Sequence, residues 1–256
     1  MKSLQDITKN FKPKHAIVEE QTNLYCENCG RYYDWFKFDN GYEFRHGCDC
    51  AIKELGRQER QRNKQRKINS IFNQSHINQA LKDVSVKSYV PQNNEQAYAK
   101  QTAIEYVKNF SLDNPRTIIF QGSYGTGKSH LSVAIAKALK KQGYTVAFMH
   151  IPKLMDRIKA TYNKDAEETT DELVKLLSGI DLLILDDVGV DDTNHTLTKL
   201  FSIVDNRVGK NNIFTTNFTD KELKKSTDWQ RINSRMKSNA RRVKVIGKDY
   251  REQDAW

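Results

Sequence analysis

The eight residues from Gly122 to Ser129 restrict the fold of this chain more than any other segment. They read Gly-Ser-Tyr-Gly-Thr-Gly-Lys-Ser, follow a strand-like run at Thr117–Gln121 and precede a helical stretch at His130–Lys141. In such a loop the glycines let backbone N–H groups surround phosphate groups, and the helix N-terminus adds its positive dipole end. The strand, loop and helix together predict a P-loop that binds ATP with Mg2+.

Two side chains of this loop have predicted chemical roles. Lys128 is expected to reach the β- and γ-phosphates, and the Ser129 hydroxyl to coordinate Mg2+. The full set of residues predicted to contact the nucleotide from this segment is Gly122, Ser123, Tyr124, Gly125, Thr126, Gly127, Lys128, Ser129 and His130.

A second apolar strand, Leu182–Asp186, ends in two adjacent carboxylates. A buried strand that delivers an acid at its carboxyl end is what a Walker B element needs, because the acid must reach the magnesium shell beside the P-loop. We therefore assign Asp186 to Mg2+ and Asp187 to the polarisation of the attacking water. A helix cap or a solvated turn stays open as another reading of Asp187.

A third strand-like run, Ile213–Thr216, is followed by Asn217. Asn217 is predicted to lie between the P-loop and the Walker B strand, within reach of the γ-phosphate or the lytic water. The alternative is that Asn217 only opens the turn that follows. Further strands are expected at Thr145–Ile151 and Val243–Ile246, and an amphipathic helix at about 92–110. Strands alternating with helices predict a parallel sheet flanked by helices on both faces.

All four cysteines lie in the first fifth of the chain, at Cys26, Cys29, Cys48 and Cys50. Four thiolates suit a tetrahedral Zn2+ site, and with no open coordination position such a site is structural rather than catalytic. The second pair is separated by one residue rather than the usual two, so His46 stays open as a replacement ligand. A module this small can fold because the metal substitutes for a core.

The formal net charge of +10 favours a polyanionic partner such as nucleic acid, although many proteins of similar charge bind none. A run from residue 53 to 68 contains seven basic and two acidic residues and predicts an exposed helix or a flexible arm. The sequence has no apolar run long enough to span a bilayer and no secretory signal at its start, so a cytoplasmic protein is expected.

These motifs occur together with Arg231-Ile-Asn-Ser-Arg235-Met near the C-terminus. In this combination the chain resembles the DnaC/DnaI branch of AAA+ ATPases, the replicative helicase loaders, including phage-encoded members. The resemblance implies an AAA+ P-loop domain with a central parallel sheet flanked by helices, preceded by a small zinc-binding N-terminal module. The implied domains are residues 1–68, a linker at 69–79 and the ATPase domain at 80–256.

The resemblance also implies roles for three arginines. Arg235 would be the arginine finger that reaches ATP on a neighbouring subunit, with Arg231 supporting it from the same helix face. Arg251 resembles a sensor 2 arginine that contacts the nucleotide, although that match is loose. A finger acting on a neighbour implies self-association through the AAA+ interfaces.

The resemblance implies partners as well. Helical stretches at about 152–163 and 169–178 match an insertion that lines a channel for single-stranded DNA in the family. There the cations and the stacking ring would come from Lys153, Arg157, Lys159, Tyr162 and Lys164. The N-terminal module would bind the helicase, with nucleic-acid binding by that module as the competing reading.

The predicted function is thus ATP-dependent loading of a hexameric DnaB-type replicative helicase onto single-stranded DNA, with a DNA-stimulated ATPase acting as the switch. The alternative is an IstB-like transposition helper ATPase that remodels target DNA, whose core would read almost identically. A small-molecule kinase is disfavoured because no lid-like insertion is evident, and a zinc-finger transcription factor because it would not need the P-loop. The predicted cofactors are ATP, Mg2+ and Zn2+.

Overall fold

The computed structural model describes residues 15–56, 59, 63, 66, 81–163, 165–166 and 168–252. The chain divides into two compact units, residues 1–63 and 64–256. The predicted linker at 69–79, much of the basic run and Lys164 lie outside the described residues. Across the described part of the chain, no helix combines the length and apolar character needed to cross a membrane.

The first unit contains a three-stranded antiparallel sheet, formed by β1 (Ile17–Cys26), β2 (Arg31–Phe38) and β3 (Glu43–His46) in that order. A helical segment begins at Cys50 and follows β3. Among the described residues of this unit only Cys26, Phe36 and Cys48 are buried. One phenylalanine ring and two thiol groups are too little apolar surface to hold a sheet together without help.

The second unit is built on a five-stranded sheet of β4 (Thr117–Gln121), β5 (Val146–His150), β6 (Leu182–Asp186), β7 (Asn211–Thr216) and β8 (Ala240–Lys244). The order across the sheet is β5-β6-β7-β4-β8, and every pairing is parallel. The strand β7 therefore lies between the P-loop strand β4 and the Walker B strand β6. The carboxyl ends of these three strands meet at one edge, where a ligand site is expected in a parallel sheet.

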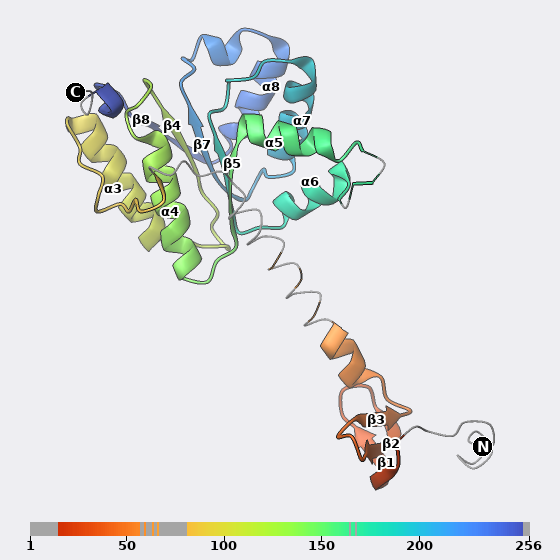
Figure 1. Ribbon diagram of the computed structural model, residues 1–256. Helices are drawn as coiled ribbons and strands as arrows, with labels where there is room; N and C mark the ends of the chain where they lie inside the picture. The colour runs from red at the N-terminus through yellow and green to blue at the C-terminus, as the bar shows by residue number, and fades with distance from the viewer. Residues whose placement is uncertain are drawn as a thin grey trace. The chain divides into compact units, whose positions relative to one another are not determined.

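Helices cover both faces of this sheet, as the alternating pattern predicts (Figure 1). On one face lie α3 (Asn94–Lys108) and α4 (Lys128–Lys141). On the other face lie α5 (Ile151–Ala160), α6 (Thr170–Ser178), α7 (Asn194–Asp205) and α8 (Thr227–Met236). Short 3-10 turns occur at η3 (Glu222–Lys224) and η4 (Tyr250–Glu252).

Alternate residues of each strand contribute to two separate apolar clusters. In β4, Ile118 and Phe120 pack toward α3 and α4, whereas Ile119 packs toward the opposite helices. Because both faces are buried, the strands read as continuous apolar runs rather than as alternating ones. This is why the strands at 117–121 and 182–186 could be predicted to the residue.

Other element bounds differ from the expectation. β8 was expected at Val243–Ile246 but spans Ala240–Lys244, because an edge strand need not be apolar: Arg241 is exposed and Arg242 pairs with Asp220. The helix α4 begins at Lys128, two residues before the expected start, because Gly127 in a left-handed conformation (φ 90°) serves as its N-cap. The two helices of the predicted insertion are present as α5 and α6.

Candidate functional site

The loop between β4 and α4 has the conformation of a phosphate cradle. Gly125 and Gly127 have φ values of 64° and 90°, in the left-handed region that disfavours side chains. A Cβ atom at Gly125 would lie 1.7 Å from the Asp249 carboxylate, and one at Gly127 would lie 2.4 Å from the Tyr89 ring. Both positions thus favour glycine for backbone conformation, and Gly127 also for space because the buried Tyr89 ring lies against it.

The Lys128 ammonium group is buried at the centre of this loop. It donates to the carbonyl oxygens of Gly122 (3.1 Å) and Ser123 (2.5 Å), which belong to the loop itself. Burial lowers the pKa of Lys128 to about 8, although the nearby Asp187 and Asp186 carboxylates act in the opposite direction. A desolvated cation held only by loop carbonyls, with no ion pair to a described carboxylate, suits a polyphosphate that brings negative charge.

Ser129 and Asp186 form the oxygen cluster expected of a magnesium site. The Ser129 hydroxyl lies 2.9 and 3.0 Å from the two Asp186 carboxylate oxygens, and Thr215 from β7 donates to Asp186 Oδ1 at 2.7 Å. Burial, followed by the neighbouring negative charge of Asp187, raises the pKa of Asp186. Hydroxyl and carboxylate oxygens are ligands that Mg2+ prefers, so these residues fit the ion.

Asp187 is held differently from its neighbour. Its backbone is left-handed (φ 59°), its N–H donates to Thr215 Oγ1 at 2.9 Å, and its Oδ2 accepts from His150 Nε2 at 3.1 Å. The hydrogen bond to His150 lowers the pKa of Asp187, and it raises the pKa of His150. The two adjacent carboxylates therefore have their pKa values shifted in opposite directions, as is common where two acids serve different roles.

Asn217 follows β7 and is therefore at the strand end between β4 and β6. Its side-chain Oδ1 is buried and has no hydrogen-bond partner among the described residues. A buried polar atom left without a partner costs stability unless a ligand or water satisfies it. The Asn217 Oδ1 thus has an unused acceptor at the strand end beside β4 and β6.

The C-terminal segment returns to the P-loop. The Tyr250 N–H donates to the Gly125 carbonyl at 3.0 Å, and the Arg251 guanidinium pairs with Asp249 at 2.9 and 2.7 Å. The positive charge of Arg251 also acts on Lys128 and Asp187. Arg251 therefore lies near the P-loop, where a sensor 2 arginine is expected, and its described partner is a carboxylate rather than a phosphate.

His130, in the first turn of α4, has its side chain directed to the segment before α3. Its Nε2 lies 3.1 Å from the Ser85 carbonyl and 3.3 Å from Ser88 Oγ, and its ring packs edge-on against Tyr89. Burial lowers the pKa of His130. The structure thus places the His130 ring beside the loop but attaches it to the segment at 85–89.

Arg231 and Arg235 lie one turn apart on α8 and line a shallow hollow of about 310 Å3 together with Phe201. Arg235 pairs with Asp205 at 2.5 Å and extends over the Phe201 ring at 5.9 Å, with its side chain 45% exposed. Arg231 is more exposed and pairs weakly with Asp228 at 4.0 Å. Because α8 and α4 lie on opposite faces of the sheet, the structure does not bring Arg235 to the P-loop of its own chain.

The residues of the predicted insertion differ from one another in their partners and in their exposure. Arg157 makes two hydrogen bonds to Glu168 (3.1 and 2.8 Å) with both side chains largely buried, so this guanidinium has a structural partner. Tyr162 is 55% exposed, and its hydroxyl bonds His195 Nε2 at 2.9 Å. Lys153 is exposed and lies 3.9 Å from Asp156.

The four cysteines form one cluster in the first unit. All four sulfur atoms lie within 4.8 Å of one another, and the Cys29 and Cys48 sulfurs are 3.7 Å apart. Tetrahedral zinc with Zn–S bonds of about 2.3 Å holds its sulfurs about 3.8 Å apart, so the cluster fits this ion. All four thiols are free of disulfides, and His46 does not belong to the cluster.

Sequence reasoning missed three residues that the structure brings to the nucleotide site. His150 ends β5 and is paired in register with Asp186, Thr215 contacts both acids from β7, and Tyr89 packs under Gly127. The available signal for His150 was a polar residue that ends β5, and for Thr215 it was the pair of threonines that ends β7. Tyr89 gave no signal, because it comes from a segment far away in sequence.

Comparisons with known proteins agree with this geometry. A model of the family described as "IstB-like ATP binding protein" matches residues 41–255. The replicative helicase loader DnaC of Escherichia coli (strain K12) is 31% identical over 146 residues, which are 57% of this chain and 59% of DnaC. This chain thus spans about three fifths of the length of the curated relatives it matches.

Solved structures show the same fold. The crystal structure of DnaI has a TM-score of 0.57 at 20% identity and covers 68% of this chain and 94% of its own. The crystal structure of the DnaC helicase loader has a TM-score of 0.57 at 24% identity, with coverages of 66% and 99%. The predicted fold, a central parallel sheet flanked by helices, is confirmed by this likeness.

Proposed function

This chain belongs to the family of IstB-like ATP-binding proteins, and we propose that it uses ATP as the switch to load a hexameric DnaB-type replicative helicase onto single-stranded DNA. The observation that carries the nucleotide part is the buried Lys128 ammonium beside the Ser129–Asp186 oxygen pair. The loading part is supported by the similarity to DnaC, a protein named as a replicative helicase loader.

In this proposal different residues of the chain have different roles at the ATP site. Lys128 and the loop N–H groups hold the phosphates, Ser129 and Asp186 hold Mg2+, and Asn217 and Asp187 position the attacking water. Bound Mg2+ supplies charge neutralisation for the phosphate oxygens. His150 keeps Asp187 ionised and oriented, because its Nε2–H donates to the carboxylate.

We assign Arg235 to the ATP of a neighbouring subunit, supported by its place on the helix layer opposite α4. Arg235→Ala is expected to retain ATP binding but to lower ATP hydrolysis in the DNA-bound assembly by about 1000-fold, the scale of an arginine finger. Hydrolysis is followed as phosphate release. Arg241→Ala, which removes another exposed arginine from β8, serves as the matched control and should hydrolyse normally.

Mixing subunits distinguishes action on a neighbour from action within one chain. An Arg235→Ala subunit keeps an intact P-loop, whereas a Lys128→Ala subunit keeps an intact Arg235. A mixture of the two should recover part of the lost activity, because Arg235 of one subunit can serve the ATP of the other. A mixture as inactive as its components would place Arg235 in its own chain's site or outside catalysis.

The N-terminal unit is proposed as the helicase-binding part, with zinc held by the four cysteines. Tyr25 and Tyr32 of its sheet and Tyr42, just before β3, are each more than half exposed, and Tyr25 and Tyr32 are in ring contact at 5.3 Å. Exposed aromatic side chains of this kind are enriched at protein interfaces. A nucleic-acid contact by this unit remains the competing proposal.

The test uses the full chain and candidate hexameric helicases. Wild-type chain with ATP is expected to co-purify with its helicase and to stimulate helicase loading on circular single-stranded DNA. Tyr32→Ser combined with Tyr42→Ser should reduce co-purification at least tenfold, while ATP binding stays normal. Tyr98→Ser, which removes an exposed tyrosine from α3, is the matched control. Wild-type chain that neither binds nor loads any helicase would refute the proposal.

The transposition helper remains the second candidate, because the matching family model carries the IstB name. Such a helper remodels duplex target DNA, so footprinting separates the two functions. ATP-dependent protection of duplex DNA, without protection of single strands, would favour the helper. Protection of single-stranded DNA favours the loader, with cations from Lys153 and Lys159 and a stacking ring from Tyr162.

A further inference from the structure

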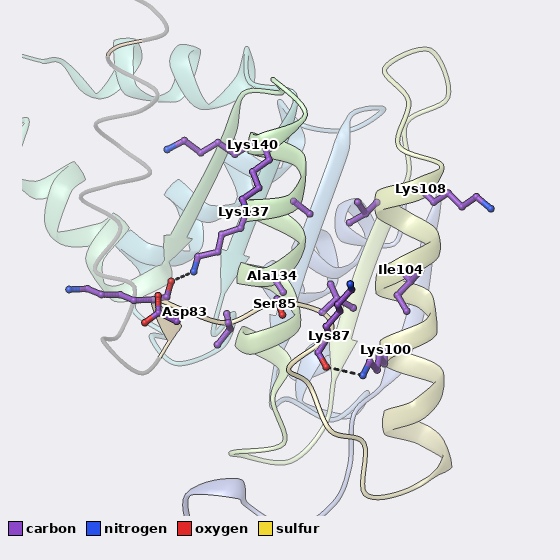
Figure 2. Close-up of a pocket in the computed structure, with 15 residues that line it drawn as sticks. Asp83, Ser85, Lys87, Lys100, Ile104, Lys108, Ala134, Lys137 and Lys140 are labelled. Atoms are coloured by element: carbon purple, nitrogen blue, oxygen red, sulfur yellow. Dashed lines mark hydrogen bonds between the residues drawn. The ribbon is translucent and has the colours of Figure 1, made fainter.

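A groove of about 1120 Å3 is lined by residues of α3 and α4, which cover one face of the sheet, and Figure 2 shows the side chains that line it. Its walls are α3, α4 and the segment at 82–87. Seven lysines and a single acidic residue, Asp83, line it. We refer to it as the lysine-rimmed groove. None of the residues assigned to ATP lines it.

The floor of the groove is aliphatic. Ile104 of α3 is 43% exposed within it, and Val84, Val86 and Val107 lie beside it, partly buried against the core under α3 and α4. Exposing an isoleucine between lysines costs hydrophobic stabilisation, and a partner that covers it recovers this at ~25 cal/mol per Å2. The floor therefore favours an apolar contact rather than water.

Several lysine charges at the rim have no carboxylate to neutralise them among the described residues. Lys100 donates to the carbonyls of Tyr89 (2.6 Å) and Lys87 (3.3 Å), and Lys137 donates to the carbonyl of Lys82. Salt bridges between described residues involve none of Lys87, Lys100 and Lys108. Burial is the largest cause that lowers the pKa of His130, and the positive charges of Lys100 and Lys137 lower it further. The effect of these two charges indicates a positive potential along this face. An anionic partner would complement it.

The residues that line the groove favour an acidic protein helix over a nucleic acid as the anionic partner. It contains no aromatic or arginine side chain on which a base could stack. A phosphate backbone would meet the lysines but leave Ile104 and the valines uncovered. An amphipathic helix with an acidic face satisfies both parts, because its apolar positions at i, i+3, i+4 and i+7 cover the floor while its carboxylates reach the rim.

We infer that the lysine-rimmed groove docks an acidic amphipathic helix of a partner protein. The two helical walls have nearly equal lengths. α3 contains 15 residues and α4 contains 14, so each is ~21–23 Å long at 1.5 Å per residue. A partner helix of about four turns would lie along them. The inference is independent of the helicase-loading proposal, because it requires neither ATP nor the first unit.

The test measures binding of a labelled 16-residue peptide to the full chain by fluorescence anisotropy at physiological salt. The peptide has leucine at helical spacing and glutamate elsewhere, and its matched control has serine in place of leucine. Ile104→Glu is expected to weaken binding of the leucine peptide at least tenfold, because it places a carboxylate on the floor. The new side chain can pair with Lys100 and Lys108 one turn away, so α3 should stay folded.

Control variants separate docking from general attraction to a basic protein. Lys175→Glu makes a lysine-to-acid change on α6, outside the groove, and should change the affinity less than twofold. Lys87→Glu and Lys108→Glu at the rim should each weaken it severalfold. Unchanged ATP affinity in Ile104→Glu shows that the second unit is intact.

Three results would overturn the inference. The first is peptide binding that Ile104→Glu leaves unchanged, or equal binding of the serine peptide. The second is a single-stranded oligonucleotide that displaces the peptide and itself loses affinity in Ile104→Glu, which would make the groove a nucleic-acid surface. The third is dissociation of a self-assembled wild-type oligomer by Ile104→Glu in sedimentation, which would assign the groove to a second copy of this chain.

Discussion

Lys128→Ala is expected to lower ATP affinity by roughly 100-fold, which corresponds to the loss of two charge-assisted hydrogen bonds of ~1.5 kcal/mol each. The physical reason is the position of the ammonium group, which is buried, desolvated and held only by the carbonyls of Gly122 and Ser123. A phosphate oxygen that enters the loop replaces these weak partners with a full negative charge. Affinity is measured by isothermal titration with Mg2+ present.

The fold should survive this substitution. Because burial lowers the pKa of Lys128 to about 8, keeping the ammonium charged opposes folding below that pH, and this penalty fades as pH rises from about 8 toward 10.5. Removing the amine is therefore expected to leave the free energy of unfolding at pH 7 unchanged or higher. Lys141→Ala, at the exposed opposite end of α4, should bind ATP normally. ATP affinity within threefold of wild type in Lys128→Ala would show that ATP binds elsewhere.

Cys48→Ser is expected to remove zinc from the first unit and to unfold its three-stranded sheet. Cys48 is one of three buried residues in the described part of that unit, so the metal must supply stability that the core does not. Structural zinc sites contribute ~10–16 kcal/mol of binding free energy, which no core of this size can replace. Zinc content by elemental analysis should fall from one ion per chain to well below half.

A matched control decides between cysteine and histidine ligation. His46→Ala changes a nearby exposed residue outside the sulfur cluster and should retain full zinc content. Loss of zinc in His46→Ala but not in Cys48→Ser would show that the imidazole is the ligand. Because the second unit has its own core, ATP affinity in Cys48→Ser should equal that of wild type.

Much of the nucleotide site could be predicted because its residues are adjacent in sequence. The P-loop, Asp186 and the strand before Asn217 each form a short continuous pattern, and burial on both faces makes the strands distinct from their surroundings. The cysteine cluster was equally visible, since four cysteines gathered in one short stretch are typical of a structural metal site. The three-stranded sheet that holds them was not predicted, because β1 is exposed over most of its length and β3 has only four residues, so neither shows a clear buried face.

Contacts between distant segments could not be predicted. Tyr89 under Gly127 and Asp249 against Gly125 depend on how the segment before α3 and the C-terminal segment close over the loop. The pairing of Arg157, one of the expected DNA contacts, with Glu168 was likewise not visible in the sequence. Each of these requires a particular three-dimensional approach that no local spacing encodes.

The sequence by itself thus determined the motifs of this protein, namely a P-loop sequence, an apolar strand that ends in two carboxylates and a group of four cysteines. Only the tertiary structure decided which side chains lie beside these motifs. The sheet order β5-β6-β7-β4-β8 brings His150 to Asp187 and Thr215 to Asp186, and it places Arg235 on the opposite helix layer from α4. The physical reason is that motifs reflect bonding along the chain, whereas partners across the sheet are set by strand order and by packing of its two faces.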